Sequence, residues 1–465
     1  MGLADWWLAR SEAPEKSTKA SLFRWPLKRA KSEPRRPHLQ LRAVAALCSK
    51  DADADEATPC RISLRGLSAS VSQAKGLLQQ YVSLYPSLVP LSLPSVKCLK
   101  EQSTEEPTTE PEPSQTAFKW TPSDVLVQFE AQFQALVSKG SLESKMTSDG
   151  CGGVYFLQDA SAPDATPLGV FKPRDEEYMA PKNPRGYVKE NAIVGETDHP
   201  VNKGFRVGNG ALRERAVYLL DESYGGFSGV PLTSVMTLPL ANGEVKEGSV
   251  QAFVESECSA EDMGPLKFSV PQVHKVGILD VRLFNTDRHA GNILLHRRSS
   301  NASTFEMTPI DHGFCLPSYK HLDNANFDWL QWPQAQFPFT CEEIDHIASL
   351  DSQRDAALLR SLGIEEECIT TMRLCTAVLK IGADEGFSLF EIGSQLQRDG
   401  DFSQPSPLEK LVVEALDVVQ EKMPQADESS MEFADGLVQE VERAVAELFS
   451  TQQPKKKVRS ISCFS

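Results

Sequence analysis

Apolar residues recur at helical spacing in the segment around residue 130. Val125, Phe129 and Phe133 lie four positions apart, which is typical of one face of an α-helix. Thr121 predicts the amino-terminal cap of this helix, and Gly140 predicts its end. The pattern therefore indicates a packing helix between these two residues.

The rest of the chain alternates between short β-prone runs and helical stripes. The predicted strands lie at 154–156, 169–173, 251–255, 293–296 and 307–310, the last two forming a hairpin across a polar turn. The predicted helices lie at 212–221, 273–283, 372–381, 408–419 and 437–448. The aromatic segment 328–340 predicts no regular helix. It forms either a loop facing lipid or substrate, or core packing by Trp329 and Trp332.

Residues 1–116 have the composition of a weakly ordered arm. They are rich in Ser, Pro, Ala and mixed charge, and 101–114 is an acidic Pro/Thr linker that cannot support a packed core. Two islands, Trp6 to Leu8 and 62–84, interrupt this composition. The first is interpreted either as a membrane-surface anchor or as a flexible tail with a few aromatic residues.

Charge and cysteine content narrow the class of protein. The net charge is −16, yet the first fifty residues and the last twelve are basic, so the body of the chain is strongly acidic. An acidic body argues against general binding of nucleic acid. The ten cysteines contain no CxxC pair, which favours a reducing compartment. The tail PKKKVRS is either a nuclear-import or anionic-surface patch or a solvated end, and no pattern predicts the oligomeric state.

A glycine cluster precedes the first β-prone run. Gly150, Gly152 and Gly153, followed by Val154, would let backbone amides approach phosphate oxygens closely, although such a cluster is also common in plain turns. Lys172 lies in a short apolar strand, where its charge is costly unless it pairs with an anion. The alternative is an edge-strand lysine that points to solvent.

Two further segments would complete a nucleotide site around Lys172. Glu214 lies on one face of the predicted helix 212–221 and is the best candidate partner for Lys172, against the alternative of an ordinary surface acid. The run 251–255 predicts a strand that leads into a hinge. Backbone groups of Phe253 and Val254 would hydrogen-bond an adenine edge there.

The most specific pattern is DRHAGN at 287–292, followed by Asp311 in IDHGF. An Asp and an Asn five positions apart, with a second Asp one hairpin later, match the spacing of a proton-accepting Asp287, a metal-binding Asn292 and a metal-binding Asp311. His289 and His312 are assigned structural hydrogen bonds, because Mg²⁺ prefers oxygen ligands. The alternative is a chance set of turn-forming residues.

Together, GGVYF, VFKPRDEEYMAPKNPRGYV, HKVGILDVRLFNTDRHAGN, IDHGFCLP and the WPQA segment resemble the phosphatidylinositol 3- and 4-kinase superfamily, and most closely the plant-like gamma branch of type II phosphatidylinositol 4-kinases. The resemblance implies an α+β, two-lobed protein-kinase-like fold, with a β-rich N-lobe (117–255), a mostly helical C-lobe (256–450), the disordered arm 1–116 before them and the basic tail 451–465 after them.

The resemblance also implies an activity and its partners. It implies ATP, Mg or Mn as the cation, and phosphoryl transfer to the 4-hydroxyl of phosphatidylinositol. Lys172, Glu214 and Asp287 match the catalytic residues of the family. Cys151 departs from the small hydroxyl residue usual in the glycine loop, and the cysteine cluster of the animal enzymes does not appear.

Other functions remain open on the sequence alone. A Ser/Thr protein kinase of the same fold and a non-catalytic ATP-binding scaffold are the two alternatives. The expected location is cytoplasmic with peripheral membrane contact, and nuclear if the basic tail is an import signal.

Overall fold

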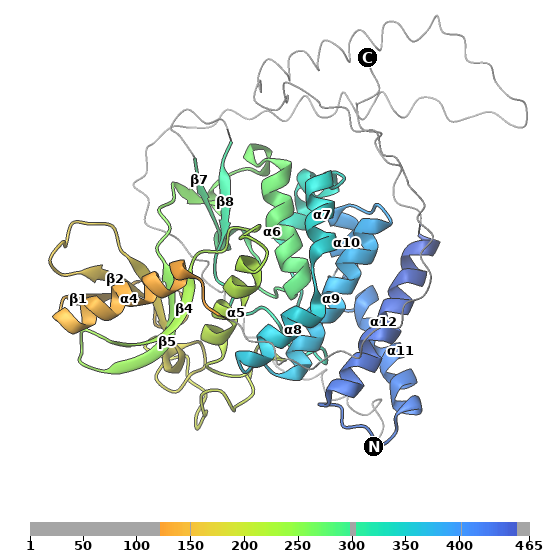
Figure 1. The fold of residues 1–465 in the computed structure, drawn as a ribbon, viewed down its shortest axis with the longest axis horizontal. Coiled ribbons are helices and arrows are strands. Elements are labelled where there is room, and N and C mark those ends of the chain that lie inside the picture. The colour runs from red at the N-terminus through yellow and green to blue at the C-terminus, as the bar shows by residue number, and fades with distance from the viewer. Residues whose placement is uncertain (1–120, 149, 298–303, 401, 453–465) are drawn as a thin grey trace, which may run out of the picture. The chain divides into compact units, whose positions relative to one another are not determined.

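The computed structural model describes residues 121–452, except for 149, 298–303 and 401. Figure 1 shows a β-sheet with helix α4 at one end of this part of the chain, and a group of helices, α6 to α12, at the other. The predicted α+β fold, with a β-rich part followed by a mostly helical part, is confirmed. The predicted arm, its two islands and the basic tail lie outside the described residues.

The first part is built on a five-stranded antiparallel sheet in the order β1-β2-β3-β5-β4. Its strands are β1 (Leu142–Met146), β2 (Tyr155–Asp159), β3 (Gly169–Pro173), β4 (Thr233–Pro239) and β5 (Val245–Ala252). Helix α4 (Asp124–Lys139) contacts β1 and β4, and helix α5 (Gly210–Glu222) contacts β4 and β5. Buried side chains of both helices and of the sheet form one hydrophobic core.

Helix α4 corrects two details of the sequence prediction. Its cap is Ser123, whose hydroxyl accepts a hydrogen bond from the Leu126 amide at 3.3 Å, and not Thr121. Val125 is 57 % exposed, and the buried stripe consists of Leu126, Phe129, Phe133 and Leu136. A strict four-residue repeat drifts around a helix of 3.6 residues per turn, so a mixed spacing of three and four keeps the stripe on the sheet. Gly140 ends the helix in the left-handed conformation, as predicted.

The second part is mostly helical and has its own core. A small antiparallel sheet, β6-β7-β8, precedes most of these helices: β6 (Cys258–Ser259), β7 (Ile293–His296) and β8 (Glu306–Pro309). The helices are α6 (Val270–Leu283), α7 (Cys341–Ser349), α8 (Ser352–Ser361), α9 (Glu366–Asp384), α10 (Leu389–Gly393), α11 (Pro407–Lys422) and α12 (Met431–Thr451). The proposed division between lobes at 255 and 256 falls in the connection from β5 to β6.

The aromatic segment after β8 packs into the core. Its residues form two short 3₁₀ helices, η7 (Asp328–Gln331) and η8 (Pro333–Gln336). Trp329 is fully buried and Trp332 is 7 % exposed, so core packing by the two tryptophans is confirmed, whereas Phe337 later in the segment is 53 % exposed.

Among the described residues, no helix combines the length and the apolar composition needed to cross a membrane. The described cysteines are all free thiols, in agreement with the absence of paired cysteine motifs.

Candidate active site

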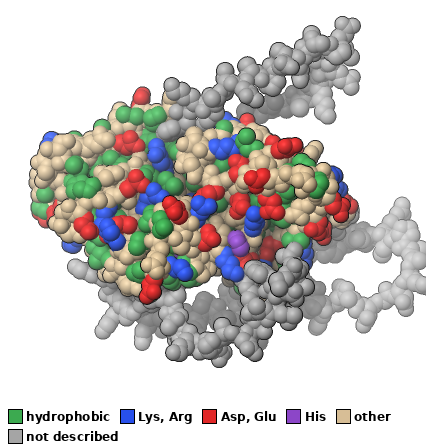
Figure 2. All heavy atoms as spheres, turned by 90° about the horizontal axis from the view of Figure 1, so that it is seen from below, with side chains coloured by type: hydrophobic (Ala, Val, Ile, Leu, Met, Phe, Trp, Pro, Cys, Tyr) green, Lys and Arg blue, Asp and Glu red, His purple; other side chains and the backbone are tan. Residues whose placement is uncertain are grey.

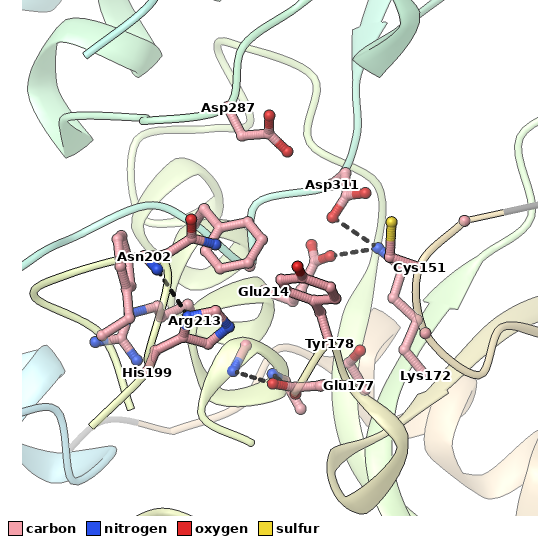
Figure 3. Close-up of a pocket in the computed structure, with 18 of the residues that line it drawn as sticks. Cys151, Lys172, Glu177, Tyr178, His199, Asn202, Arg213, Glu214, Asp287 and Asp311 are labelled. Carbon is pink, nitrogen blue, oxygen red and sulfur yellow. Dashed lines mark hydrogen bonds and ion pairs between the residues drawn. The ribbon is translucent and has the colours of Figure 1, made fainter. Parts of the chain in front are cut away.

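A cavity of about 440 Å³ opens where the sheet meets the helical part, and several predicted site residues line it (Figure 3). One side is formed by the glycine cluster and by Lys172 of β3. Asp287 and Asp311 reach it from the connections that follow α6 and β8. Residues far apart in the chain are therefore brought to one cavity, as the sequence analysis expects.

The glycine cluster lies between β1 and β2 and packs directly against the short helix η3 (Arg174–Glu176). The Gly153 amide donates a hydrogen bond to the Glu176 carbonyl at 3.0 Å. A Cβ on Gly152 would lie 3.0 Å from that carbonyl oxygen, and a Cβ on Gly153 would lie 1.8 Å from Oε2 of Glu176. The two glycines therefore make room for this packing, which keeps Gly150 to Val154 at the mouth of the cavity.

Replacing Gly153 by Ala is expected to lower the free energy of unfolding by about 1–3 kcal/mol, because the added methyl group overpacks the site. Glu176 cannot move away cheaply: it is 4 % exposed, and it binds the Tyr155 hydroxyl at 2.7 Å and Lys246 Nζ at 2.6 Å. Urea denaturation measures the change. Gly264→Ala is the matched control, since a Cβ there meets no atom within 4 Å. Equal stabilities of the two variants would contradict this account.

Lys172 is held between two carboxylates. Its Nζ lies 2.7 Å from Oε1 of Glu214 and 3.0 Å from Oδ1 of Asp311. Burial alone would lower the pKa of Lys172, but the negative charges of Asp311 and Glu214 outweigh burial and raise it. Burial would likewise raise the pKa of Glu214, yet Lys172 and the nearby His312 lower it. The predicted pair of Lys172 and Glu214 is confirmed as an ion pair, and Glu214 is buried rather than on the helix surface.

A buried group behind Asp287, which the sequence analysis did not predict, holds the DRHAGN loop. We call it the Asp280 cluster: Asp280 of α6 with Asn285, Arg288 and Trp329, all at most 1 % exposed. The carboxylate of Asp280 accepts from Arg288 Nε at 3.0 Å, from Asn285 Nδ2 at 3.0 Å and from Trp329 Nε1 at 3.0 Å. An acid in the apolar stripe 273–283 was the available signal, because a buried acid requires partners.

The same arginine connects the loop to the hairpin. Arg288 Nη1 donates to the carbonyl oxygens of Asn292 at 2.5 Å and Ile310 at 2.9 Å, and the Ile310 amide donates to the Asn292 carbonyl at 3.0 Å. The hairpin register pairs Ile293 with Pro309. Asn292 and Asp311 are consequently brought to neighbouring positions, which a shared metal site requires.

The two aspartates make the cavity suitable for a cation. Burial first, and then the negative charge of Asp311, raise the pKa of Asp287 to about 6. The side-chain amide of Asn292 donates to the Asp287 carbonyl at 3.0 Å and so orders the loop. The part of the chain that the structure describes contains no cluster of three or more His, Cys, Asp or Glu side chains able to hold a metal by themselves. One carboxylate together with phosphate oxygens can nevertheless hold Mg²⁺, and Asp311 offers that carboxylate. Asn292, the other predicted ligand, is 2 % exposed and is not among the residues that line the cavity.

The predicted structural role of one histidine is confirmed and that of the other remains a prediction. His289 Nδ1 accepts from the Gly291 amide at 3.1 Å. His312 is fully buried, with Nδ1 3.4 Å from Oε2 of Glu214. This position, behind the ion pair of Lys172, suits a group that orients Glu214.

The hinge prediction does not coincide with this cavity. Strand β5 ends at Ala252, and neither Phe253 nor Val254 lines the cavity. The Phe253 amide donates to the Leu168 carbonyl at 3.2 Å. The ring of Phe253 makes an edge-to-face contact with the ring of Phe156, with 5.7 Å between the ring centres. An adenine contact by these two residues therefore stays a prediction about a neighbouring region.

The cavity also has a side that the sequence analysis did not assign. The segment between β3 and α5 contributes Tyr178, His199, Asn202 and Phe205, and α5 contributes Arg213. That segment has no strand or helical periodicity, so no sequence pattern indicated that it reaches the cavity.

Comparison with known proteins agrees with this arrangement. Residues 150–392 match the family model described as "Phosphatidylinositol 3- and 4-kinase". Phosphatidylinositol 4-kinase gamma 4 of rice (Oryza sativa subsp. japonica) is 43 % identical over 285 residues, covering 59 % of this chain and 48 % of that protein. Phosphatidylinositol 4-kinase gamma 2 of Arabidopsis thaliana is 37 % identical over 336 residues, covering 67 % and 58 %.

The chain spans about half the length of the curated relatives it matches first. Among solved structures, the Helicobacter pylori proinflammatory kinase CtkA is similar at 13 % identity and a TM-score of 0.28, covering 55 % of this chain and 97 % of that one. The family match covers the glycine cluster, Lys172, Glu214, Asp287 and Asp311, and it extends over more than half of the chain. The chain belongs to the phosphatidylinositol 3- and 4-kinase family.

Proposed function

We propose that this protein transfers the γ-phosphate of ATP to the 4-hydroxyl of phosphatidylinositol. The observation that carries the proposal is the convergence of Lys172, Asp287 and Asp311 on one cavity, beside a glycine cluster. The names of the gamma-type relatives support the lipid as acceptor.

Family membership implies ATP and a divalent cation in general, and we propose Mg²⁺ held by Asp311 and Asn292. When bound, the cation neutralises the charge that develops on the phosphates. Mn²⁺ is the alternative, and the carboxylate and amide oxygens on offer suit both ions.

The chain's own residues then have distinct roles. The oxygen of the acceptor hydroxyl forms a bond to the γ-phosphorus of ATP, and Asp287 accepts the proton of that hydroxyl. The bond between the γ-phosphorus and the oxygen that bridges it to the β-phosphate breaks, and ADP leaves. Lys172, oriented by Glu214, holds the phosphates. The glycine cluster lines the same cavity, and because the Gly153 amide is bonded to the Glu176 carbonyl, we assign the contact with those phosphates to the Gly152 amide.

The acceptor is tested by radiolabelled phosphate transfer. Wild-type protein and Asp287→Asn are given ATP with Mg²⁺, phosphatidylinositol in mixed micelles, and a generic basic protein in parallel. Label in the lipid that disappears in the variant is the expected result. Label only in the basic protein would replace the lipid acceptor with protein Ser/Thr, and ATP binding without any transfer would favour the scaffold.

The net charge of the chain is the reason for offering a basic protein as an acceptor in that assay. The net charge is −16, which opposes approach to an anionic membrane within about 10 Å, near a Debye length. On the face drawn in Figure 2, acidic and basic side chains are interspersed, without one large basic field among the described residues. We propose a cytoplasmic protein whose peripheral membrane contact follows from the lipid acceptor and not from its net charge. Import into the nucleus through the basic tail is a separate proposal about residues outside the described part.

A further inference from the structure

The side of the cavity away from Lys172 has no role in the chemistry described so far. Figure 3 shows His199, Asn202 and Arg213 together on this side, with Lys172, Cys151 and Asp311 on the other and Asp287 above. All of these residues line the same cavity. Asp287 and these residues therefore share one cavity, and we call the part formed by Tyr178, His199, Asn202, Phe205 and Arg213 the acceptor side.

Asn202 presents a side-chain amide to the acceptor side. It is half-buried and lines the cavity, and its side chain has no hydrogen bond to any described residue. Only its backbone amide is engaged, donating to His199 Nδ1 at 2.8 Å. An amide offers two donors and an acceptor, which suits vicinal hydroxyl groups.

His199 is oriented by this same turn. Its Nδ1 accepts from the amides of Val201 and Asn202 at 3.3 and 2.8 Å, which assigns the proton to Nε2. Burial lowers the pKa of His199, and the backbone of Tyr178 beside the ring raises it in part. The residue is 6 % exposed, and its Nε2 has no hydrogen-bond partner among the described residues. A buried donor without a partner is costly, and a ligand hydroxyl would remove that cost.

Arg213 adds a buried positive charge without a close ion pair among the described residues. Burial raises the pKa of Glu177, which also lines the cavity, and the charge of Arg213 is among those that lower it. It is 1 % exposed, its Nε has no partner within the described part of the chain, and Nη2 lies 3.9 Å from Oε2 of Glu365. Its hydrogen bond to the Asn209 carbonyl is long at 3.4 Å, and its hydrogen bond to Cys368 Sγ has the ordinary length for sulfur, 3.5 Å. The guanidinium lies 5.0 Å from the centre of the Phe205 ring. A buried cation in this state favours an anionic ligand.

We propose that the acceptor side is the binding site for a phosphorylated polyol, with Asn202 and His199 recognising ring hydroxyls and Arg213 offsetting the phosphodiester charge. This assignment rests on the proposed function, because it places the acceptor hydroxyl next to Asp287. Tyr178 and Phe205 supply aromatic walls to the same compartment. The ligand is presented either by a lipid headgroup or as a soluble glycerophosphodiester.

Two other occupants fit the observations less well. The phosphates of the nucleotide are accounted for by Lys172 and the glycine cluster on the opposite side. A Ser or Thr side chain of a protein acceptor offers a single hydroxyl and no charge for Arg213. The side-chain amide of Asn202 has no hydrogen bond to a described residue, and Arg213 has no close ion pair with such a residue. A ligand that carries both hydroxyl groups and a negative charge, an anionic polyol, suits these two side chains together.

The test compares Asn202→Ala with Asn242→Ala, a matched control in the exposed β4–β5 turn. Asn202→Ala is expected to raise KM for phosphatidylinositol in mixed micelles roughly tenfold, because it removes hydrogen bonds to the headgroup. KM for ATP, ATP hydrolysis without acceptor, and the melting temperature are expected to match those of the control. The same assay with soluble glycerophosphoinositol as the acceptor shows whether the site binds the headgroup alone or requires the lipid.

His199→Asn is the second variant. The Asn carbonyl can replace Nδ1 as the acceptor of the two loop amides, while the Nε2 donor is lost. It is expected to raise KM for the lipid by a similar factor. His199→Gln, whose side-chain amide reaches the Nε2 position, is expected to raise KM for the lipid less than His199→Asn does.

Each outcome separates the two proposals. Lipid labelling by the wild type with an unchanged KM in both variants would overturn the acceptor site and leave the proposed function standing. A rise in KM for ATP instead would assign this compartment to the nucleotide. Labelling of the basic protein alone would overturn the proposed function. Calorimetric titration of the wild type with glycerophosphoinositol would then test the acceptor side by itself. If glycerophosphoinositol did not bind, the polyol assignment would be wrong.

Discussion

Phosphate transfer by Asp287→Asn is expected to fall about 10²–10⁴-fold in kcat, the usual contribution of a positioned general base. The variant keeps the size of the side chain and loses only its capacity to accept the proton. The backbone of residue 287 remains fixed, because its amide donates to Asn285 Oδ1 at 2.9 Å and its carbonyl accepts from Asn292 Nδ2 at 3.0 Å. KM for ATP is expected to change little, since Lys172 and the glycine cluster are untouched.

The measurement is kcat with saturating ATP and Mg²⁺, with Asp345→Asn as the matched control. Asp345 is exposed on α7, away from the residues that line the cavity. Melting temperatures of both variants exclude misfolding as the cause. If Asp287→Asn retained the wild-type kcat for every acceptor offered, the general-base assignment would be wrong.

Asp280→Asn is expected to lower the free energy of unfolding by about 3–5 kcal/mol, because it leaves the buried charge of Arg288 without a counter-charge. Arg288 is fully buried, and Nε lies 3.0 and 3.1 Å from the two oxygens of Asp280. The carboxylate of Asp280 accepts hydrogen bonds from Arg288, Asn285 and Trp329. The NH₂ group of an Asn cannot accept a hydrogen bond, so at least one of these donors would lose its partner. The loss measures this uncompensated charge and not the net contribution of the ion pair.

Urea denaturation of the variant and of Arg443→Ala provides the comparison. Arg443 pairs with Glu440 on the surface with its side chain 66 % exposed, so its removal is expected to change stability by only about 0.5 kcal/mol or less. A loss below about 1 kcal/mol in Asp280→Asn would show that Arg288 reaches water or another anion. Because Arg288 also binds the carbonyls of Asn292 and Ile310, the variant is expected to lose catalytic activity even where it is folded.

The predictable part of the site consists of residues whose role follows from their neighbours in the sequence. Asp287 and Asn292 lie in one short loop, and the hairpin 293–309 brings Asp311 to them through local strand pairing. Lys172 in an apolar strand required an anion, and Glu214 on the next helix supplied it at 2.7 Å. The hinge residues Phe253 and Val254 were expected at the same cavity, but β5 ends before them and they lie outside its lining.

The sequence by itself therefore determined the helices α4, α5, α6, α9, α11 and α12, the strand β3, the β7–β8 hairpin and the kinase constellation, because periodicity, turn chemistry and motif spacing are properties of short segments. It did not indicate β1, β4, α7 or α8. The tertiary structure decided which residues lie behind and beside that constellation. Trp329 is buried because its indole reaches Asp280, 49 positions earlier, and His199 and Asn202 reach the cavity from a segment without periodicity. Contacts between distant segments depend on how the elements pack, and no local pattern records that packing.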